Sequence, residues 1–432
     1  MDFSQEQRQV IRSVSEYVQA LISQKPSRAL YERYEPFISQ VTPDIAFEVF
    51  YALYQDGIDL DQLLNVLEPV MNTFHKPLTE KEQVKPDDKS FIGLLAAENK
   101  ALVEKINELK VFIQRQDDAA KTSLRKGLAD LQAVNHHYLK KENILFPYLE
   151  KKAKRYQGLA LMWALHDKAR MLLKRTAEVY ASPAASDKER FQLLGKLFFV
   201  LQGLVNKEDW ILFPVAIKQC NDLEQIDMLR QCRDYEWTLI DPPDLEAVIR
   251  SVQHPAQAGQ KKLDQKGQRL MSESQTGTSQ PGTAVLDAKQ DKHMYFQTET
   301  GKLSLAQVDQ VFAALPVDLT VVDEQNRVCY FNRPKERVFP RSPAIIGRKV
   351  ENCHPPQSVH KVMEIISAFR EGRREKASFW INLHGQMVLI QYFALRDDTN
   401  QYRGTLEVSQ DITGIQKLEG EQRLLSWPDD QP

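Results

Sequence analysis

Apolar side chains recur every three or four positions through most of the first 240 residues. This spacing is typical of amphipathic helices, and Thr42 followed by Pro43 marks a helix start with an N-cap and a Pro at the first helical position. The first such stripe consists of Val10, Ile11, Val14, Tyr17, Val18 and Leu21. The pattern predicts helices at about 4–23, 27–39, 44–56, 59–74, 90–115, 119–153, 156–181 and 186–219.

After about residue 300 the apolar period changes from three or four positions to two. Alternating segments rich in β-branched and aromatic residues indicate strands. A longer helix is expected at about 357–372, ended by Gly372. The expected strands are 318–323, 327–332, 377–383, 387–396 and 404–411. Two strands, helices and then three strands indicate a compact α+β domain.

The segment 254–292 separates these two patterns and is dominated by Gln, Gly, Ser, Thr and Lys. Such a composition buries too little apolar surface to offset the entropy lost on ordering, which indicates a flexible linker. We therefore expect several domains, with an all-α half before an α+β half. The expected boundaries are a small helical domain at 1–80, a helical bundle at 85–240, a linker at 250–295 and the α+β domain at 300–425.

Composition excludes several classes of protein. The chain has 432 residues with 57 basic and 59 acidic side chains, a net charge of −2, which argues against a dedicated nucleic-acid binder. No apolar run approaches the roughly 18 residues of a membrane span, and no secretion signal opens the chain, so we expect a cytoplasmic protein. The four cysteines lack the paired spacing of a disulfide framework or a thiolate zinc site.

A short repeat occurs in the helical half. Lys141-Glu142 precedes Leu-Phe-Pro ending at Pro147, and Lys207-Glu208 precedes Leu-Phe-Pro ending at Pro214. Each Pro marks a point where its helix is expected to kink. The two acids are 66 residues apart, about the length of one antiparallel helix pair, so the repeat predicts a four-helix bundle. Such bundles form metal sites from inward-facing acids and histidines on neighbouring helices.

These segments resemble the hemerythrin-like HHE cation-binding family over about 90–220. The resemblance is carried by Asn135-His136-His137, Lys141-Glu142-Asn143, Leu145-Phe146-Pro147, Trp163-Ala164-Leu165-His166-Asp167, Lys207-Glu208 and Leu212-Phe213-Pro214. It implies a metal site of His137, Glu142, His166 and Glu208 that holds iron, manganese or zinc.

The chain departs from the family pattern at two positions. Lys141 stands where the family has an acid four residues after His137, and in the second repeat Leu204 stands where the family has a histidine four residues before Glu208. Glu142 is five residues from His137, about 140° around an α-helix, so the two converge less easily. A dinuclear dioxygen carrier is therefore disfavoured, whereas a mononuclear site stays open. The alternative is that the Lys-Glu pairs are solvated salt bridges and the histidines bind no metal.

The C-terminal segment resembles PAS domains over about 305–425. The matching motifs are 315–323, 328–332, Ile346-Gly347-Arg348, 353–358, the helix ending at Gly372, and Gln410-Asp411-Ile412-Thr413. The resemblance implies a five-stranded antiparallel sheet around a small cavity that holds haem, flavin, a metabolite or nothing. His354 is a candidate haem ligand; the favoured alternative is that it caps a turn. The order of helical domain, HHE bundle, linker and PAS domain looks like a bacterial family with this layout.

Two domains without a visible catalytic arrangement favour a non-enzymatic role. His354, His360 and His384 are isolated in sequence, and no nucleotide-binding motif occurs. We expect a sensory or regulatory protein that acts through an unidentified protein partner, with no nucleic-acid or membrane partner. A helix at about 414–425 is the expected output and homodimer face. Two alternatives are an iron- or oxygen-handling redox metalloprotein and a metal-free scaffold.

Overall fold

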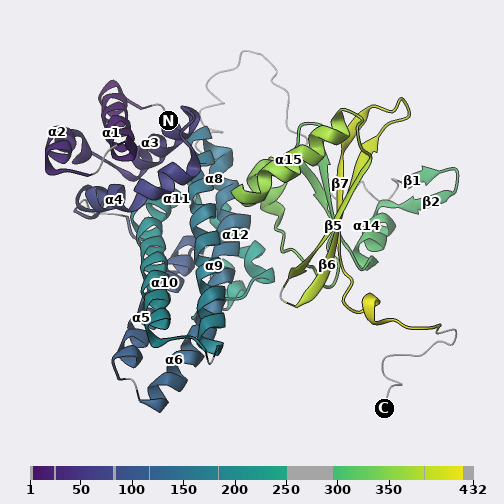
Figure 1. Ribbon diagram of the computed structural model, residues 1–432. Coiled ribbons are helices and arrows are strands. Elements are labelled where there is room, and N and C mark those ends of the chain that lie inside the picture. Colours follow the sequence, from purple (N-terminus) through teal and green to yellow (C-terminus); the bar gives the residue numbers. More distant parts are fainter. Residues whose placement is uncertain are drawn as a thin grey trace. The chain divides into compact units, whose positions relative to one another are not determined.

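The computed structural model describes most of the chain as two compact units, one helical and one built around a sheet (Figure 1). The linker predicted at 250–295 falls almost entirely on residues outside the described ones. The described residues are 3–23, 26–80, 84–115, 117–182, 184–250, 295–383 and 385–421.

The helical unit contains helices over the ranges that the apolar periodicity predicts, with ends that differ by a few residues. The two predicted helices 119–153 and 186–219 are each divided by a π-helix, and the first also by a 3₁₀ turn. Thr42 caps the third helix, and its side chain accepts a hydrogen bond from the backbone N–H of Ile45. The helix α12 was not predicted. The helices are α1 (Gln5–Ser23), α2 (Arg28–Ile38), α3 (Pro43–Gln55), α4 (Leu60–Thr79), α5 (Phe91–Arg115), α6 (Asp118–Asp130), α7 (Val134–Lys140), α8 (Phe146–Lys152), α9 (Ala160–Ala181), α10 (Asp187–Lys207), α11 (Phe213–Gln219) and α12 (Asp222–Gln231).

Four long helical segments form the bundle. They are α5, the run from α6 to α8, α9, and the run from α10 to α11 (Figure 1). Buried apolar residues from Val10 in α1 to Ile249 form one continuous core. The segments predicted as separate domains at 1–80 and 85–240 therefore share a core within a single compact unit.

Two π-helices interrupt the bundle where the sequence repeat predicts kinks. They are η2 (Lys141–Leu145) and η4 (Glu208–Leu212), and each is followed by an α-helix whose second residue is Pro147 or Pro214. Proline has no N–H to donate and its ring crowds the carbonyl four residues earlier, so a wider turn before it relieves the conflict. Within η2 the wider turn buries the adjacent Lys141 and Glu142 together.

The second unit contains the predicted five-stranded antiparallel sheet, in the order β4-β3-β7-β6-β5. Phe369 of helix α15 (Pro356–Arg370) packs on Val388, Ile390 and Tyr392 of β6. A hairpin and a helix that the sequence pattern missed precede the sheet. The strands are β1 (Tyr295–Thr298), β2 (Gly301–Ser304), β3 (Asp318–Asp323), β4 (Val328–Phe331), β5 (Lys376–Leu383), β6 (Gln386–Arg396) and β7 (Tyr402–Asp411), and the helix is α14 (Leu305–Ala314).

Two expectations for the C-terminal half were wrong. The alternation of apolar residues along 377–383 predicts Phe379 and Ile381 on an apolar inner face under the helix at 357–372, but they are 40% and 36% exposed because β5 is an edge strand. The helix expected at 414–425 is only a 3₁₀ turn, η9 (Ile415–Lys417), within the described residues, and residues from 422 onward lie outside them. Among the described helices, none combines the length and apolarity needed to cross a membrane.

Candidate functional site in the helical bundle

The four site residues predicted from the sequence lie together in the bundle interior. His137 is on α7, Glu142 in η2, His166 on α9 and Glu208 at the start of η4, and none is more than 1% exposed. His137 Nε2 lies 3.0 Å from Glu208 Oε2, and His166 Nδ1 lies 2.8 Å from Glu142 Oε1. His166 Nε2 faces the other oxygen of Glu208 at 3.8 Å. Both imidazole rings therefore approach the same carboxylate.

A fifth buried residue, Glu98 on α5, was not assigned to the site from the sequence. Its Oε2 lies 2.7 Å from His137 Nδ1, and its Oε1 accepts hydrogen bonds of 2.6 Å from Lys140 Nζ and from the backbone N–H of Thr238. The sequence signal that could have identified Glu98 is its position between Leu95 and Leu102 on the apolar stripe of the helix, where an acid exposed to water is not expected.

Each buried glutamate has a cation supplied by the chain itself. Lys141 Nζ pairs with Glu208, and Lys140 Nζ pairs with Glu98, with both lysine side chains fully buried. Arg170 Nη2 donates to Glu142 Oε2 at 2.7 Å. The interpretation of the Lys-Glu segments as solvated pairs is therefore wrong for Lys141-Glu142. Three buried carboxylates therefore face three cationic side chains of the same chain.

The environment keeps all three carboxylates ionised. Burial favours the neutral acid, but the charges of Lys141 and His137 outweigh it and hold the pKa of Glu208 well below its usual value. The pKa values of Glu98 and Glu142 are also lowered against the effect of burial, by His137 and Lys140 in one case and by Arg170 and His166 in the other.

Aromatic rings cover the cations of the network. The Tyr138 ring stacks on His166, with centroids 4.3 Å apart, and lies 4.8 Å from Lys141 Nζ. Lys140 Nζ lies 4.2 Å from the centroid of Trp237. Burial lowers the pKa of Lys141 more than Glu208 raises it. The rings partly replace lost hydration through their negative faces, which attract a desolvated ammonium group.

The residues do not fit the metal site that the family resemblance implies. His137 uses both ring nitrogens on Glu98 and Glu208, and the oxygens of the three glutamates are all engaged. Within the described part of the chain, no group of three or more His, Cys, Asp and Glu side chains is arranged to hold a metal ion. A metal at Glu208 would have to displace the Lys141 ammonium group. Metal ligation by the four residues stays a prediction.

His354, the candidate haem ligand, lies in the sheet unit after a 3₁₀ turn, η8 (Val350–Cys353). Its Nδ1 lies 2.9 Å from the carbonyl oxygen of Val350, to which it donates, and burial lowers the pKa of the imidazole. The hydrogen bond agrees with the alternative in which His354 caps a turn. Haem ligation by His354 remains a prediction.

Comparisons with known proteins identify a domain in each half of the chain. A family model described as the hemerythrin HHE cation binding domain matches residues 90–231, and a PAS domain model matches 308–413. No curated protein matches the chain.

Three solved structures are similar to part of the chain. A C-terminal domain from Streptococcus mutans is 32% identical and covers 30% of this chain and all of its own, with a TM-score of 0.29. A PAS domain from Colwellia psychrerythraea is 24% identical and covers 26% of this chain and 98% of its own, with a TM-score of 0.21. The PAS domain of Bordetella pertussis BvgS is 17% identical and covers 25% and 86%, with a TM-score of 0.20. On the evidence of the two family models, the chain combines a hemerythrin HHE domain with a C-terminal PAS domain.

Proposed function

We propose that this chain is a sensory or regulatory protein that acts through protein contacts, with a PAS domain that responds to a ligand and an HHE bundle that needs no resident metal. The observation that carries the proposal is the buried ion pair between Lys141 and Glu208. Lys141 lies four residues after His137 in the sequence. A lysine ammonium group supplies positive charge and three hydrogen-bond donors to the carboxylates. It therefore replaces the charge that a metal ion would contribute.

The energetics of buried charge support this assignment. To bind Glu208, a metal ion would have to move Lys141 and leave a charged amine in a core that includes Tyr138, Leu145 and Phe146. An unpaired charge in such a core costs several kcal/mol, roughly 3–5 by analogy with broken buried ion pairs. The lysine thus competes directly with metal binding.

The geometry of the network supports a structural role in a regulatory protein. Its members come from α5, α7, η2, α9 and η4, so the contacts fix the register of four neighbouring helical segments. Buried ion pairs often add little net stability, and in some proteins they specify one arrangement of the chain, which is the role we assign to this network. A partner protein that binds another packing arrangement of the bundle more tightly would shift the bundle toward that arrangement. This shift is how a signal would pass between the bundle and its partner.

A second candidate is an iron- or oxygen-handling metalloprotein, and one observation favours it. His166 Nε2 is buried and makes no hydrogen bond in the described residues, although it faces Glu208 at 3.8 Å. An imidazole nitrogen and a carboxylate oxygen at this spacing are two donors toward a divalent cation. A complete site would need further donors to be released from Lys141 or Arg170.

Metal analysis of the full-length chain separates the two candidates. Protein purified without added metal should contain far less than one metal ion per chain, and its melting temperature should not change with EDTA. Stoichiometric iron, manganese or zinc whose removal lowers the melting temperature would support the metalloprotein instead.

A lysine-to-acid exchange sharpens this test. Lys141→Glu places an acid four residues after His137 and removes the competing cation, so iron(II) or zinc should raise the melting temperature of this variant and not of the natural chain. Lys100→Glu, on the exposed face of α5, is the matched control and should show no metal response.

A further inference from the structure

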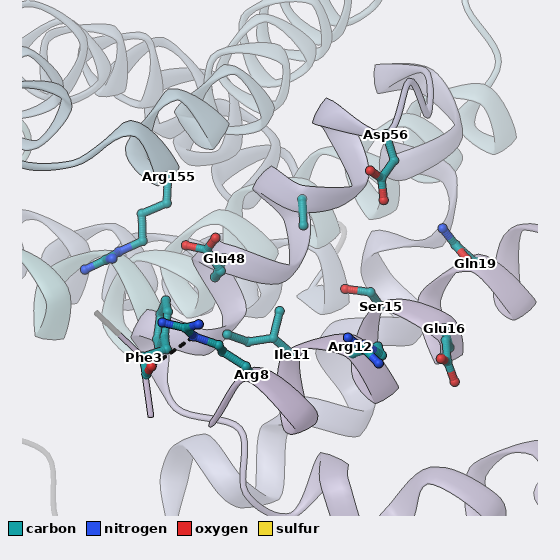
Figure 2. A pocket seen from close by; sticks show the side chains of 11 residues that line it. Phe3, Arg8, Ile11, Arg12, Ser15, Glu16, Gln19, Glu48, Asp56 and Arg155 are labelled. Carbon is teal, nitrogen blue, oxygen red and sulfur yellow. Dashed lines mark hydrogen bonds between the residues drawn. The ribbon is translucent and has the colours of Figure 1, made fainter. Parts of the chain in front are cut away.

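A groove of about 550 Å³ runs between α1 and α3, outside the charge network of the bundle (Figure 2). On α1 it is lined by a polar stripe that includes Arg8, Ser15 and Glu16. On the other side it is lined by Glu48 and Ala52 of α3 and by Asp56 at the C-cap of this helix, spaced four residues apart along one face. Figure 2 shows Arg155 beside Glu48 at one end, and Asp56 at the other.

Two buried polar atoms that line this groove have no hydrogen-bond partner in the described structure, namely Arg155 Nε and Ser15 Oγ. The Arg155 side chain is only 10% exposed, and its Nη2 lies 3.5 Å from Asp44. Buried polar groups are almost always paired in native proteins, because an unpaired one costs free energy. Their presence on a groove wall indicates that an occupant supplies the missing partners.

The half-buried Glu48 carboxylate adds a third unpaired group. Burial raises its pKa, and the charge of Arg155 opposes that effect without forming an ion pair. Glu48 makes no hydrogen bond within the part of the chain that the structure describes. It is therefore an acceptor on the groove wall that awaits a donor.

The charges divide the groove into two ends of opposite sign. Arg8, Arg155 and Glu48 line one end, with an excess of one positive charge, whereas Glu16, Asp56 and Arg12 line the other, with an excess of one negative charge. The apolar side chains Ile11 and Ala52 also line the groove. A simple anion would face three carboxylates, so the pattern favours a ligand that carries both charges.

The length of the groove sets the size of that ligand. Glu48 of α3 and Asp56 at its C-cap are eight residues apart, or about 12 Å at 1.5 Å per residue. An extended peptide covers roughly 3.3–3.6 Å per residue, so about three residues span this distance. We propose that the groove binds a short zwitterionic peptide, with its carboxylate at Arg8 and Arg155 and its ammonium group at Glu16 and Asp56. Ser15 and Glu48 bond its backbone amides.

Calorimetric titration of the full-length chain with trialanine tests this site. Trialanine should bind, and its N-acetylated and C-terminally amidated forms should each bind about ten-fold more weakly, because each loses one charge-assisted contact. Failure of trialanine to bind at millimolar concentration would overturn the proposal. Equal affinity for the three peptides, or binding of inorganic phosphate as tight as that of trialanine, would overturn it as well.

Variants place the peptide within the groove. Arg8→Gln should weaken trialanine about ten-fold and leave the amidated form unaffected, since that form lacks the carboxylate. Asp56→Asn should weaken trialanine and leave the acetylated form unaffected. Glu32→Gln on α2, which removes only an exposed ion pair with Arg28, is the control and should bind as the natural chain does. Equal binding by all variants would contradict the site. Metal content is a separate readout, so failure here leaves the proposed function untouched.

Discussion

The ammonium group of Lys141 and the carboxylate of Glu208 form an ion pair in the bundle core, where neither side chain is more than 1% exposed. The same carboxylate lies 3.0 Å from Nε2 of His137, one helical turn before Lys141. Glu208 is thus held from one direction by two consecutive turns of a neighbouring segment. At position 141, where the HHE pattern has an acid, this chain has a lysine, and its ammonium group is a structural cation.

Removal of that cation should destabilise the helical unit. Lys141→Ala leaves Glu208 in the core without its ammonium partner, and breaking a buried pair in this way costs roughly 3–5 kcal/mol of unfolding free energy. Urea unfolding followed by circular dichroism at 222 nm, a wavelength dominated by the helices, measures the loss.

An exposed pair provides the control for this variant. Lys100→Ala removes a 4.0 Å contact with Glu104 between side chains that are 80% and 67% exposed, and it should cost less than about 1 kcal/mol. The double variant Lys141→Met, Glu208→Gln removes both charges and should recover much of the loss. If Lys141→Ala were as mild as Lys100→Ala, the pair would not be buried in solution.

The three buried glutamates make stability depend on acid pH. Burial alone would raise their pKa values, but their cationic partners lower the pKa of Glu98, Glu142 and Glu208. A carboxylate with a lower pKa in the folded state stabilises the fold fully above the unfolded value of about 4.3 and loses this contribution as the pH falls through the folded value. Unfolding free energy should therefore drop steeply below about pH 4.3.

Denaturant unfolding at a series of pH values checks this dependence. Glu208→Gln removes one of the three linked protons and should flatten the acid slope by up to about 1.4 kcal/mol per pH unit. Glu104→Gln, in the exposed pair on α5, should leave the slope unchanged. An identical slope for Glu208→Gln and the natural chain would show that Glu208 takes up no proton on unfolding.

Most of the secondary structure could be predicted from the sequence because each element has a local signal. Thr42 caps the start of α3 with its side chain, and the ring of Pro43 fixes the backbone φ of the first helical residue. Gly372, with φ +71°, lies two residues after the end of α15 and prevents the helix from continuing. The sheet strands also have a local signal: along 318–323, for example, buried and partly buried residues alternate. The short hairpin of β1 and β2 was missed because its residues are mostly exposed and carry no alternation of burial.

The partners of the candidate site could not be predicted in the same way. The repeat correctly placed His137 and Glu208 in one interior, because periodicity reports which helix face is buried. Whether Lys141 lies in water or in the core depends on the π-turn before Pro147 and on the neighbouring helix that carries Glu208. Neither the wider turn nor a contact across 67 residues leaves a pattern within one helical segment.

A glycine in the sheet unit gives a third prediction. Gly404 in β7 has φ +148°, and a Cβ atom there would lie 2.2 Å from the carbonyl oxygen of Val322 in β3. Gly404→Ala should cost roughly 2–5 kcal/mol, from the backbone conformation and from displacement of the neighbouring strand. Gly414→Ala has nothing within 4 Å of the added atom and is the control.

Hydrogen exchange with mass spectrometry locates the Gly404 effect. Amides of β3 and β7 should exchange faster in Gly404→Ala, whereas α5 and α9 should keep their protection, since they belong to the other compact unit. Equal protection of β7 in Gly404→Ala and Gly414→Ala would show that the strands accommodate the side chain.

The amide of Asn332 joins three segments of the sheet unit and gives the last prediction. Asn332 is 1% exposed; its Nδ2 donates to the carbonyl oxygens of Phe312 and Val317 at 2.9 Å each, and its Oδ1 accepts from the Leu319 N–H at 2.7 Å. These bonds connect the end of α14 to the start of β3. Asn332→Ala leaves three partly buried backbone groups without this partner, at about 1–3 kcal/mol for each group that water cannot reach.

We expect Asn332→Ala to lower the unfolding free energy of the sheet unit by at least about 2 kcal/mol and to speed amide exchange in 305–323. Asn332→Asp keeps the acceptor for Leu319 but loses both donors. In this variant amide exchange should stay slow in β3 and become fast in α14, whereas in Asn332→Ala it should become fast in both. Asn382→Ala, which removes one exposed bond to the Gly385 N–H, should change neither segment. Exchange in α14 that is equally slow in all three variants would mean that the Asn332 amide does not hold this helix to the sheet.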